Sequence, residues 1–496
     1  MQDEVTCELI SITGGNPITI GNWTSYDIER DYFTPADAFT FTLEDDRADQ
    51  LNAELQIGMQ VNINVNNNCI MVGFVDSFDY TYSRQSGKKL VLRGRDLLGV
   101  IDDATIFPNL GTGGTKDFQF APSTTLDTIF NTIFTPFGAS IAVDDAPHLT
   151  LATAFAFGRK ANTTKTPKGL ARSLKTQLGH LKKPNKGEKF LGYALRFCTL
   201  VGAHIKMAPG TRDTILINCP TYNRSSPVAY NLQHISIGNN PGNNIEDGKM
   251  HVSYKEQPSA LILEGTTGAA TFKKQNFKVV SVNEITGYDR RNSDASTAVF
   301  LPAVNDAISQ LTTGIVSSGN AGTGYYLIPM KEDLYNSLPN SVVGLQTAFY
   351  RPEYMIDESG KTGSELQFTC AKRMAQYQQK YFALDYKVSG HTQMVNGSPV
   401  VWMTNTMCNV IDDTFDTTNS LSNAYWIEKV TFSKGRSSGT SSTIKLNLPN
   451  IYAFDIQYSD QDAKAAAVKR DKNVFGRHNP KITNNSTGPD GTAAGE

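Results

Sequence analysis

Two stretches of the sequence, far apart in the chain, repeat the same order of short strand patterns. Residues 60–102 alternate apolar and polar side chains through three segments, separated by an Asn-rich turn and a Ser/Arg/Gly/Lys turn. Residues 407–448 carry the same order, with 433–439 as the second turn. Alternation with a period of two indicates half-buried antiparallel strands. The internal repeat predicts two related β-barrels in one chain, the second interrupted by an insertion.

Length and composition limit the class of protein. A chain of 496 residues is too long for one hydrophobic core, so we expect several domains. With 39% hydrophobic and 19% charged residues, the composition is that of an ordinary soluble protein. The formal net charge of -2 predicts no general attraction to nucleic acid or to an anionic membrane.

The cysteines and the first residues bear on the compartment. No two of the six cysteines form a C-x-x-C pair, which favours buried free thiols: Cys7, Cys69, Cys198, Cys219, Cys370 and Cys408. The first residues are acidic and lack an apolar signal segment, and no run approaches 18 apolar residues. These features predict folding in a cytosol.

The strand and helix patterns predict a mainly β chain with α+β insertions: two related tube-like antiparallel β-barrel domains plus a mixed α/β domain. We expect the first barrel at residues 1–102 and the mixed α/β domain at residues 103–226. In the mixed domain, Ser123 is the expected N-cap of a first helix. A second helix is expected to begin near Leu191 and to end at Gly202.

The second barrel is expected in two parts, residues 227–274 and 381–450. Between them lies an insertion, residues 275–380, which carries a helix at 365–381 that a capping-box pattern begins. Residues 451–496 form a C-terminal extension whose polar composition predicts a flexible tail when alone. The same tail is able to order against a partner, and the sequence does not choose between the two.

One segment of the mixed domain, the basic loop at residues 159–189, is strongly charged. It contains ten Lys or Arg residues against a single Glu. A solvated surface loop is the simplest interpretation. Among functional interpretations, an acidic protein partner ranks ahead of nucleic acid, because the loop has almost no aromatic side chains for base stacking. Its candidate partner-binding residues are Lys182, Lys183 and Lys186.

Motifs for catalysis and metal binding are not found in the sequence. H-E-x-x-H, G-x-S-x-G and P-loop patterns are missing. Asp412, Asp413 and Asp416 could bind a hard cation, but a turn between strands explains them more simply. His391 could act as a general base, yet a hydrogen-bonded histidine at a strand end is the simpler interpretation. We therefore predict no catalytic residue, metal site or cofactor, although a carboxylate pair for glycoside cleavage needs only spatial proximity.

Several short motifs occur in a fixed order through residues 20–455. Their order resembles that of the baseplate hub proteins of contractile-tailed bacteriophages, the Mu-type or late-control-D family, more distantly related to the hub of T-even phages. Each motif is weak alone, and the colinear order supplies the specificity. The motifs are Trp23 with Ile28-Glu29-Arg30; Val72-Gly73-Phe74-Val75-Asp76 followed by residues 90–96; Pro136-Phe137-Gly138; Val201-Gly202; Arg351-Pro352; Ala371 and Arg373 before residues 386–391; Trp402 with Asn405; and residues 427–432 with 443–448.

The resemblance implies a structural, non-enzymatic role in the virion, at the baseplate of a contractile phage tail assembled in the host bacterial cytoplasm. It implies a homotrimer in which two barrels per chain form a pseudo-sixfold ring between the hexameric tail tube and the trimeric central spike. The implied partners are the tail tube or tube-initiator protein, the central spike protein and other baseplate proteins, with the tape measure protein as a further candidate and no membrane. A tail-associated cell-wall hydrolase is the alternative function, and a type VI-like spike hub is a lesser one.

Overall fold

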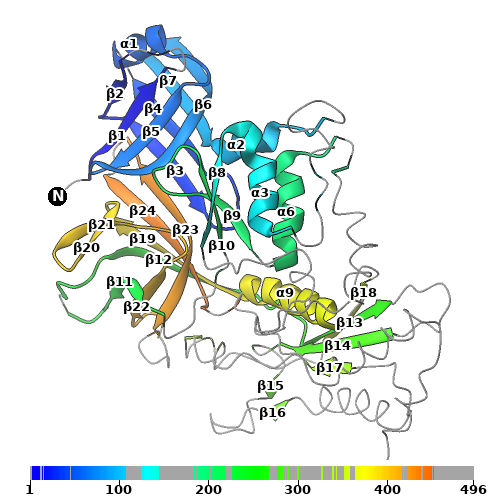
Figure 1. The fold of residues 1–496 in the computed structure, drawn as a ribbon. Coiled ribbons are helices and arrows are strands. Elements are labelled where there is room, and N and C mark those ends of the chain that lie inside the picture. The colour runs from blue at the N-terminus through cyan, green and yellow to red at the C-terminus, as the bar shows by residue number, and fades with distance from the viewer. Residues whose placement is uncertain are drawn as a thin grey trace, which may run out of the picture.

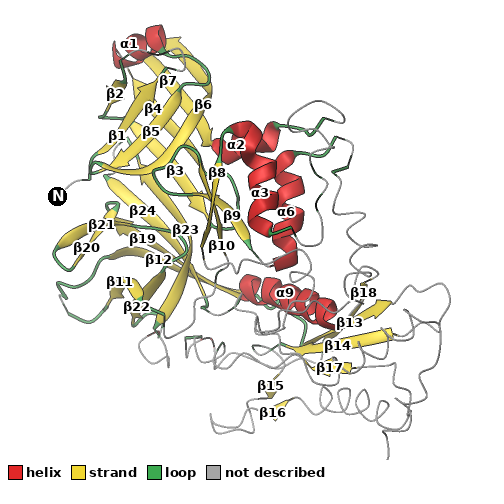
Figure 2. Cartoon of the chain, viewed as in Figure 1, coloured by secondary structure: helices red, strands yellow, loops and turns green. Residues whose placement is uncertain are grey.

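The structure is a computed structural model that describes residues 3–451 with gaps. The larger gaps are 108–123 apart from Phe118 and Phe120, 145–183, 221–225, 267–275, 290–298, 301–324, and 328–350 apart from four isolated positions. The described part is mainly antiparallel sheet with few helices (Figure 2). Within it, no helix has both the length and the apolar character needed to cross a membrane.

The repeated stretch at the start of the chain forms the predicted meander. Its three strands pair antiparallel in sequence order. Asn66 and Asn67 form the first turn with φ angles of 49° and 67°, a left-handed conformation that Asn tolerates well. The strands are β5 (Gln60–Val65), β6 (Asn68–Ser83) and β7 (Gly87–Asp96).

Four more strands complete the first barrel around this meander, in the order β2-β1-β5-β6-β7-β4-β3 (Figure 1). Alternate side chains of each strand enter one core, in which the rings of Trp23 and Phe41 lie 4.5 Å apart. Helix α1 (Asp46–Glu54) lies at one end of the barrel. The added strands are β1 (Val5–Ile10), β2 (Ile18–Ile20), β3 (Ser25–Asp31) and β4 (Ala38–Glu44).

The second barrel has the order β11-β22-β23-β24-β19-β12. The second repeat supplies its antiparallel meander, β22 (Met407–Asp412), β23 (Ala424–Lys434) and β24 (Thr440–Asn447). The predicted fold class, two related barrels plus a mixed α/β domain, is confirmed. The other strands are β11 (Val228–His234), β12 (Ile245–Val252), β19 (Phe382–Ser389), and the hairpin β20 (Thr392–Val395) and β21 (Ser398–Val401).

The mixed α/β domain packs helices against a small sheet ordered β8-β10-β9 (Figure 1). Its helix α3 begins after Thr125, whose hydroxyl accepts from the Thr128 amide. The expected cap, Ser123, lies outside the described residues, and the helix starts two residues later than predicted because Thr125 offers the same capping oxygen. The elements are α2 (Leu97–Asp103), α3 (Leu126–Phe134), η1 (Thr135–Phe137), β8 (Ser140–Asp144), α6 (Phe190–Val201), β9 (His204–Met207) and β10 (Thr214–Asn218).

The insertion has a sheet of its own, ordered β17-β14-β13-β18, with helix α9 (Gly363–Tyr381) packed on one face. The sequence placed β13 in the second barrel, but in the structure β13 pairs with β14 and β18 instead. Its apolar side chains are buried without the alternation of a half-exposed strand, as suits a sheet that a helix covers. The remaining strands are β13 (Ala260–Thr266), β14 (Asn276–Val282), β15 (Tyr288–Asp289), β16 (Val299–Phe300), β17 (Tyr325–Leu327) and β18 (Pro352–Asp357).

Candidate assembly interface

Strand β23 joins the two barrels into one continuous sheet. Its first residues pair with β22, while residues 429–434 pair antiparallel with residues 26–31 of β3. The change of neighbour occurs at a β-bulge, where the register shifts at Glu428. A bulge adds one residue and bends a strand, so β23 can leave its own barrel and continue into the next. We call the pairing of 26–31 with 429–434 the inter-barrel joint.

The central strand of each meander carries its bulge at an acidic residue. In β6 the register shifts at Asp76, which accepts from Arg95 Nε at 2.6 Å. In β23, Glu428 accepts from Lys445 Nζ at 2.8 Å and from Asn447 Nδ2 at 3.1 Å. A carboxylate at the bulge therefore binds the following strand in both barrels.

The segment before each meander repeats equally closely. Gly58 donates its amide to the carbonyl of Val75, and Asn405 donates its amide to the carbonyl of Ile427, each at 2.9 Å. Both donors have positive φ angles, 83° and 58°. Val75 and Ile427 each lie one residue before their bulge. The two meanders thus share backbone hydrogen bonds and bulge position, which confirms the predicted internal repeat.

His391 lies where the barrels meet and is fully buried. Its Nε2 is 2.6 Å from the hydroxyl of Tyr26 in β3, and its Nδ1 is 3.0 Å from the hydroxyl of Ser442 in β24. Burial lowers the pKa of this imidazole to about 4. The nearby Asp3 carboxylate raises the pKa, but its effect is smaller than that of burial. The prediction of a hydrogen-bonded histidine at a strand end is confirmed.

A buried charge cluster connects the first barrel to the mixed domain. Asp37 contacts Lys206 Nζ at 2.8 Å and Arg30 Nε at 3.2 Å. The Asp37 amide donates to Asp96, which also caps helix α2 through the amide of Gly99. Burial, together with the charge of Asp37, raises the pKa of Asp96 to about 7. Two residues of the resemblance motifs, Arg30 and Asp96, therefore hold domains together.

Among the strand edges that carry no neighbouring strand within the described part of the chain, one belongs to β12 and one to the end of β6. β12 ends the sheet, with β19 on one side only. Residues 77–83 of β6 pair with β7 on one side only, because the pairing of β6 with β5 ends at Phe74. Their side chains are partly or fully exposed, including Val252 at 40%.

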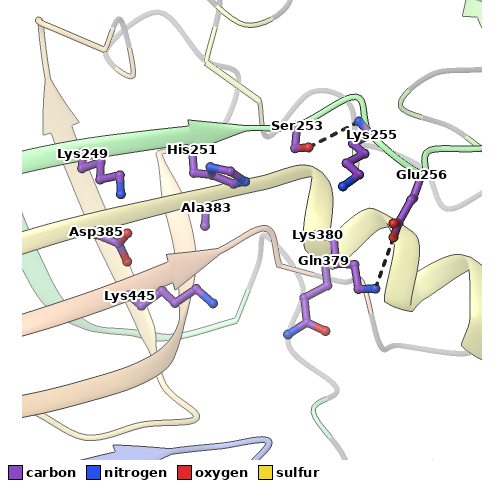
Figure 3. A pocket seen from close by; sticks show the side chains of 10 residues that line it. All are labelled: Lys249, His251, Ser253, Lys255, Glu256, Gln379, Lys380, Ala383, Asp385 and Lys445. Carbon is purple, nitrogen blue, oxygen red and sulfur yellow. Dashed lines mark hydrogen bonds and ion pairs between the residues drawn. The ribbon is translucent and has the colours of Figure 1, made fainter.

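An open groove of about 430 Å³ lies over one face of β12, β19 and β24, beside the end of helix α9 (Figure 3). Lys249 and His251 project into it from β12, Asp385 from β19 and Lys445 from β24. Burial opposes the charge of Lys445, yet the carboxylates of Glu428, Asp385 and Asp31 raise its pKa. Small-molecule sites are mostly apolar, whereas this lining is charged, so the groove suits a protein surface better than a small ligand.

His234, Asp412 and Asp413 offer ligand atoms within 4.8 Å of one another. The carboxylates already have partners: Asp412 accepts from the Tyr386 hydroxyl at 2.9 Å, and Asp413 accepts from the Ser236 amide at 2.8 Å. These bonds fix the turn after β22, in line with the simpler interpretation from sequence. Asp416, the third member of the predicted cluster, lies outside the described residues.

The candidate partner residues Lys182, Lys183 and Lys186 also lie outside the described residues, as does most of the basic loop. Only the end of the loop is described. There Lys189 contacts Asp102 at 3.2 Å, and Glu188 contacts Arg196 at 2.8 Å. The assignment of the loop to an acidic partner stays a prediction.

Comparisons with known proteins agree with this architecture. Residues 11–96, most of the first barrel, match the family model described as Mu phage baseplate assembly protein GpP-like, N-terminal. The structure superposes on the tail protein from Neisseria meningitidis MC58 with a TM-score of 0.57 and 16% identity, covering 92% of this chain and 100% of that one. It also superposes on the 43 kDa tail protein of prophage MuSo2 from Shewanella oneidensis with a TM-score of 0.53 and 15% identity, covering 90% and 99% of the two chains.

This is the fold of a phage tail protein. The resemblance to Mu-type baseplate proteins is confirmed, since it also rests on the family match in the first barrel. No curated protein matches the sequence.

Proposed function

We propose that the protein is the structural hub of a phage baseplate, a homotrimeric adaptor between the hexameric tail tube and the trimeric central spike. The proposal places it in the virion, in contact with the tube or tube-initiator protein, the spike and other baseplate proteins. The observation that carries it is the repeat of two barrels within one chain, down to the bulges at Asp76 and Glu428.

The repeat supports the proposal by symmetry. A trimer of a chain with two similar barrels presents six similar units, so it can contact a sixfold ring on one side and a threefold spike on the other. The inter-barrel joint shows how one barrel continues into the next through strand pairing. A chain with a single barrel would need a separate mechanism to change symmetry.

The proposed role is non-enzymatic. His391 and Asp96 both have strongly shifted pKa values, and both side chains are buried. His391 lies where the two barrels meet, and Asp96 lies where the first barrel meets the mixed domain. Neither faces a groove in which a polymer could bind. We expect no clearing of peptidoglycan in a zymogram, and a clearing band lost on replacing a carboxylate pair would favour the hydrolase instead.

Measurement of the assembled mass tests the proposal directly. Light scattering on the purified chain, and on the hub released from tail fractions, should give three times the chain mass of 54.3 kDa. An electron-microscopy reconstruction should then show six barrels in one ring. A monomer in both preparations, at every concentration, would contradict the proposed hub.

A further inference from the structure

The registers of the two barrels relate four strands of one barrel to four strands of the other. Val75 precedes the bulge of β6 and pairs with Gly94 of β7, as Ile427 precedes the bulge of β23 and pairs with Leu446 of β24. β6 therefore corresponds to β23, and β7 corresponds to β24.

The correspondence continues across the next two strands. Gly94 pairs with Phe39 of β4, and Leu446 pairs with Leu384 of β19. Phe39 in turn pairs with Ile28 of β3, whereas Leu384 pairs with Met250 of β12. β12 is thus the β3 of the second barrel, and Met250 takes the place of Ile28.

The inter-barrel joint uses the outer edge of β3 and the part of β23 after its bulge. Their counterparts are the outer edge of β12 and residues 77–83 of β6, and neither edge has a neighbouring strand in the described chain. One chain therefore contains one completed joint, between β3 and β23. It also contains the two strand edges that would form a second joint of the same kind. The two edges lie in different barrels, with β3 and β23 between them (Figure 1), so they can meet only between copies.

We propose that residues 77–82 of β6 in one copy pair antiparallel with residues 248–253, the end of β12 and Ser253, in the next copy. This inference rests on the proposed trimer and assigns its interface. Transferring the register of the inter-barrel joint gives these opposed pairs: Ser77 with Ser253, Phe78 with Val252, Asp79 with His251, Tyr80 with Met250, Thr81 with Lys249, and Tyr82 with Gly248.

The opposed side chains are chemically complementary. On the face toward the cores, Phe78 and Tyr80 meet Val252 and Met250, and three of these four already pack partly buried against the core cluster. At the corresponding positions of the completed joint, Ile28, Val430 and Phe432 are fully buried, and Arg30, the counterpart of Val252, is buried beside Asp37. Pairing between copies would bury the second set in the same way.

On the outer face, Asp79 lies opposite His251. The Asp79 side chain is 60% exposed and contacts Arg93 of its own chain. The groove beside β12 would offer it His251 together with Lys249 (Figure 3). An acidic side chain from one copy thus meets a cationic groove on the next, which favours this register.

Cysteine pairs test the register. Asp79→Cys with His251→Cys should form a disulfide between copies under mild oxidation, giving a covalent trimer on a non-reducing gel. Glu29→Cys with Thr431→Cys is the matched positive control, because these residues are opposed in the completed joint. Asp79→Cys with Asp247→Cys is the negative control, roughly 13 Å out of register. The single variants control for native thiols.

A side-chain change tests the same edge without cysteine. Val252→Glu should weaken association about tenfold, because a charge would enter the apolar face of the joint. Val400→Glu on β21 is the matched control, since Val400 has a similar exposure of 36% but lies away from both edges. We expect Val400→Glu to leave the trimer unchanged.

The outcomes separate this inference from the proposed function. A trimer that forms without the Asp79–His251 cross-link, or that cross-links equally at Asp247, would overturn the assigned interface and leave the hub standing. Equal effects of Val252→Glu and Val400→Glu on association would also overturn the assigned interface without contradicting the proposed hub. A wild-type chain that stays monomeric would contradict both the proposed hub function and this interface.

Discussion

The hydrogen bonds of His391 fix its protonation. The Ser442 hydroxyl donates to the carbonyl of Gly390 at 2.8 Å, so it can only accept from the imidazole. Nδ1 therefore carries the hydrogen, and Nε2 accepts from the Tyr26 hydroxyl. Burial raises the pKa of Tyr26, which keeps that donor protonated. A neutral imidazole thus bridges one strand from each barrel.

This arrangement predicts a pH-dependent stability. The folded pKa of His391 is about 4, below the usual 6.5, so the unfolded chain binds a proton that the folded chain does not. The free energy of unfolding should fall as pH falls from about 6.5 to about 4, by roughly 3 kcal/mol from this residue. Urea unfolding of wild type and His391→Gln across that range measures it.

The comparison cancels the other titrating groups. Asp96, with its pKa raised to about 7, has the opposite sign, because its stabilising proton is lost as pH rises. His204, with its pKa lowered to about 3 by burial, adds the same slope to both proteins. The His391→Gln curve should be flatter by the contribution of one histidine, and two parallel curves would rule out the assignment.

At the scale of elements, the turn before each meander requires a residue with a positive φ angle. Gly58 has a φ of 83°, and a Cβ built on it would meet nothing within 4 Å. Only backbone strain should therefore count, and Gly58→Ala should lower the free energy of unfolding by about 1 kcal/mol. Gly58→Asn should cost less, because Asn405 occupies the equivalent place in the second barrel.

Thermal and denaturant unfolding of these variants decides the point. Gly439→Ala is the matched control, because that site is equally open but lacks a positive φ. Its effect should stay within about 0.5 kcal/mol. If Gly58→Asn proved more damaging than Gly58→Ala, the equivalence of the two turns would be wrong.

Elements with a local signal were predictable from sequence. The meanders were found because their alternation records which face of each strand is buried. β13 was placed in the wrong sheet because a strand buried on both faces shows no alternation. The start of α3 was missed by two residues because two hydroxyl residues compete as caps.

The contacts that assemble the molecule were not predictable. Asp37 and Lys206 are 169 positions apart, and no sequence pattern links them. Glu428 had a detectable signal, since it occupies the same place in the second repeat as Asp76 does in the first. The free edge of β12 can be recognised only when its neighbours in the sheet are known, because its sequence does not differ from that of a paired strand.

At the scale of the whole molecule, the mixed domain is held to the first barrel by buried polar contacts. Lys206 of β9 reaches Asp37 at 2.8 Å and also contacts the carbonyl of Thr34. The hydroxyl of Tyr32 donates to Asn218 of β10 at 2.8 Å. Charges buried in this way are costly unless each keeps its partner.

Lys206→Met should therefore loosen this domain contact. It leaves Asp37 buried beside Asp96 with Arg30 as its remaining cation, and we expect a loss of about 3 kcal/mol in the free energy of unfolding. Hydrogen exchange should speed up in β9 and β10 and stay unchanged in β19 and β24 of the second barrel.

Lys88→Met is the matched control, because Lys88 and Asp49 form an ion pair with side chains 45% and 39% exposed. Its cost should stay below about 1 kcal/mol. Equal effects of the two substitutions would show that the buried cluster does not hold the domains together.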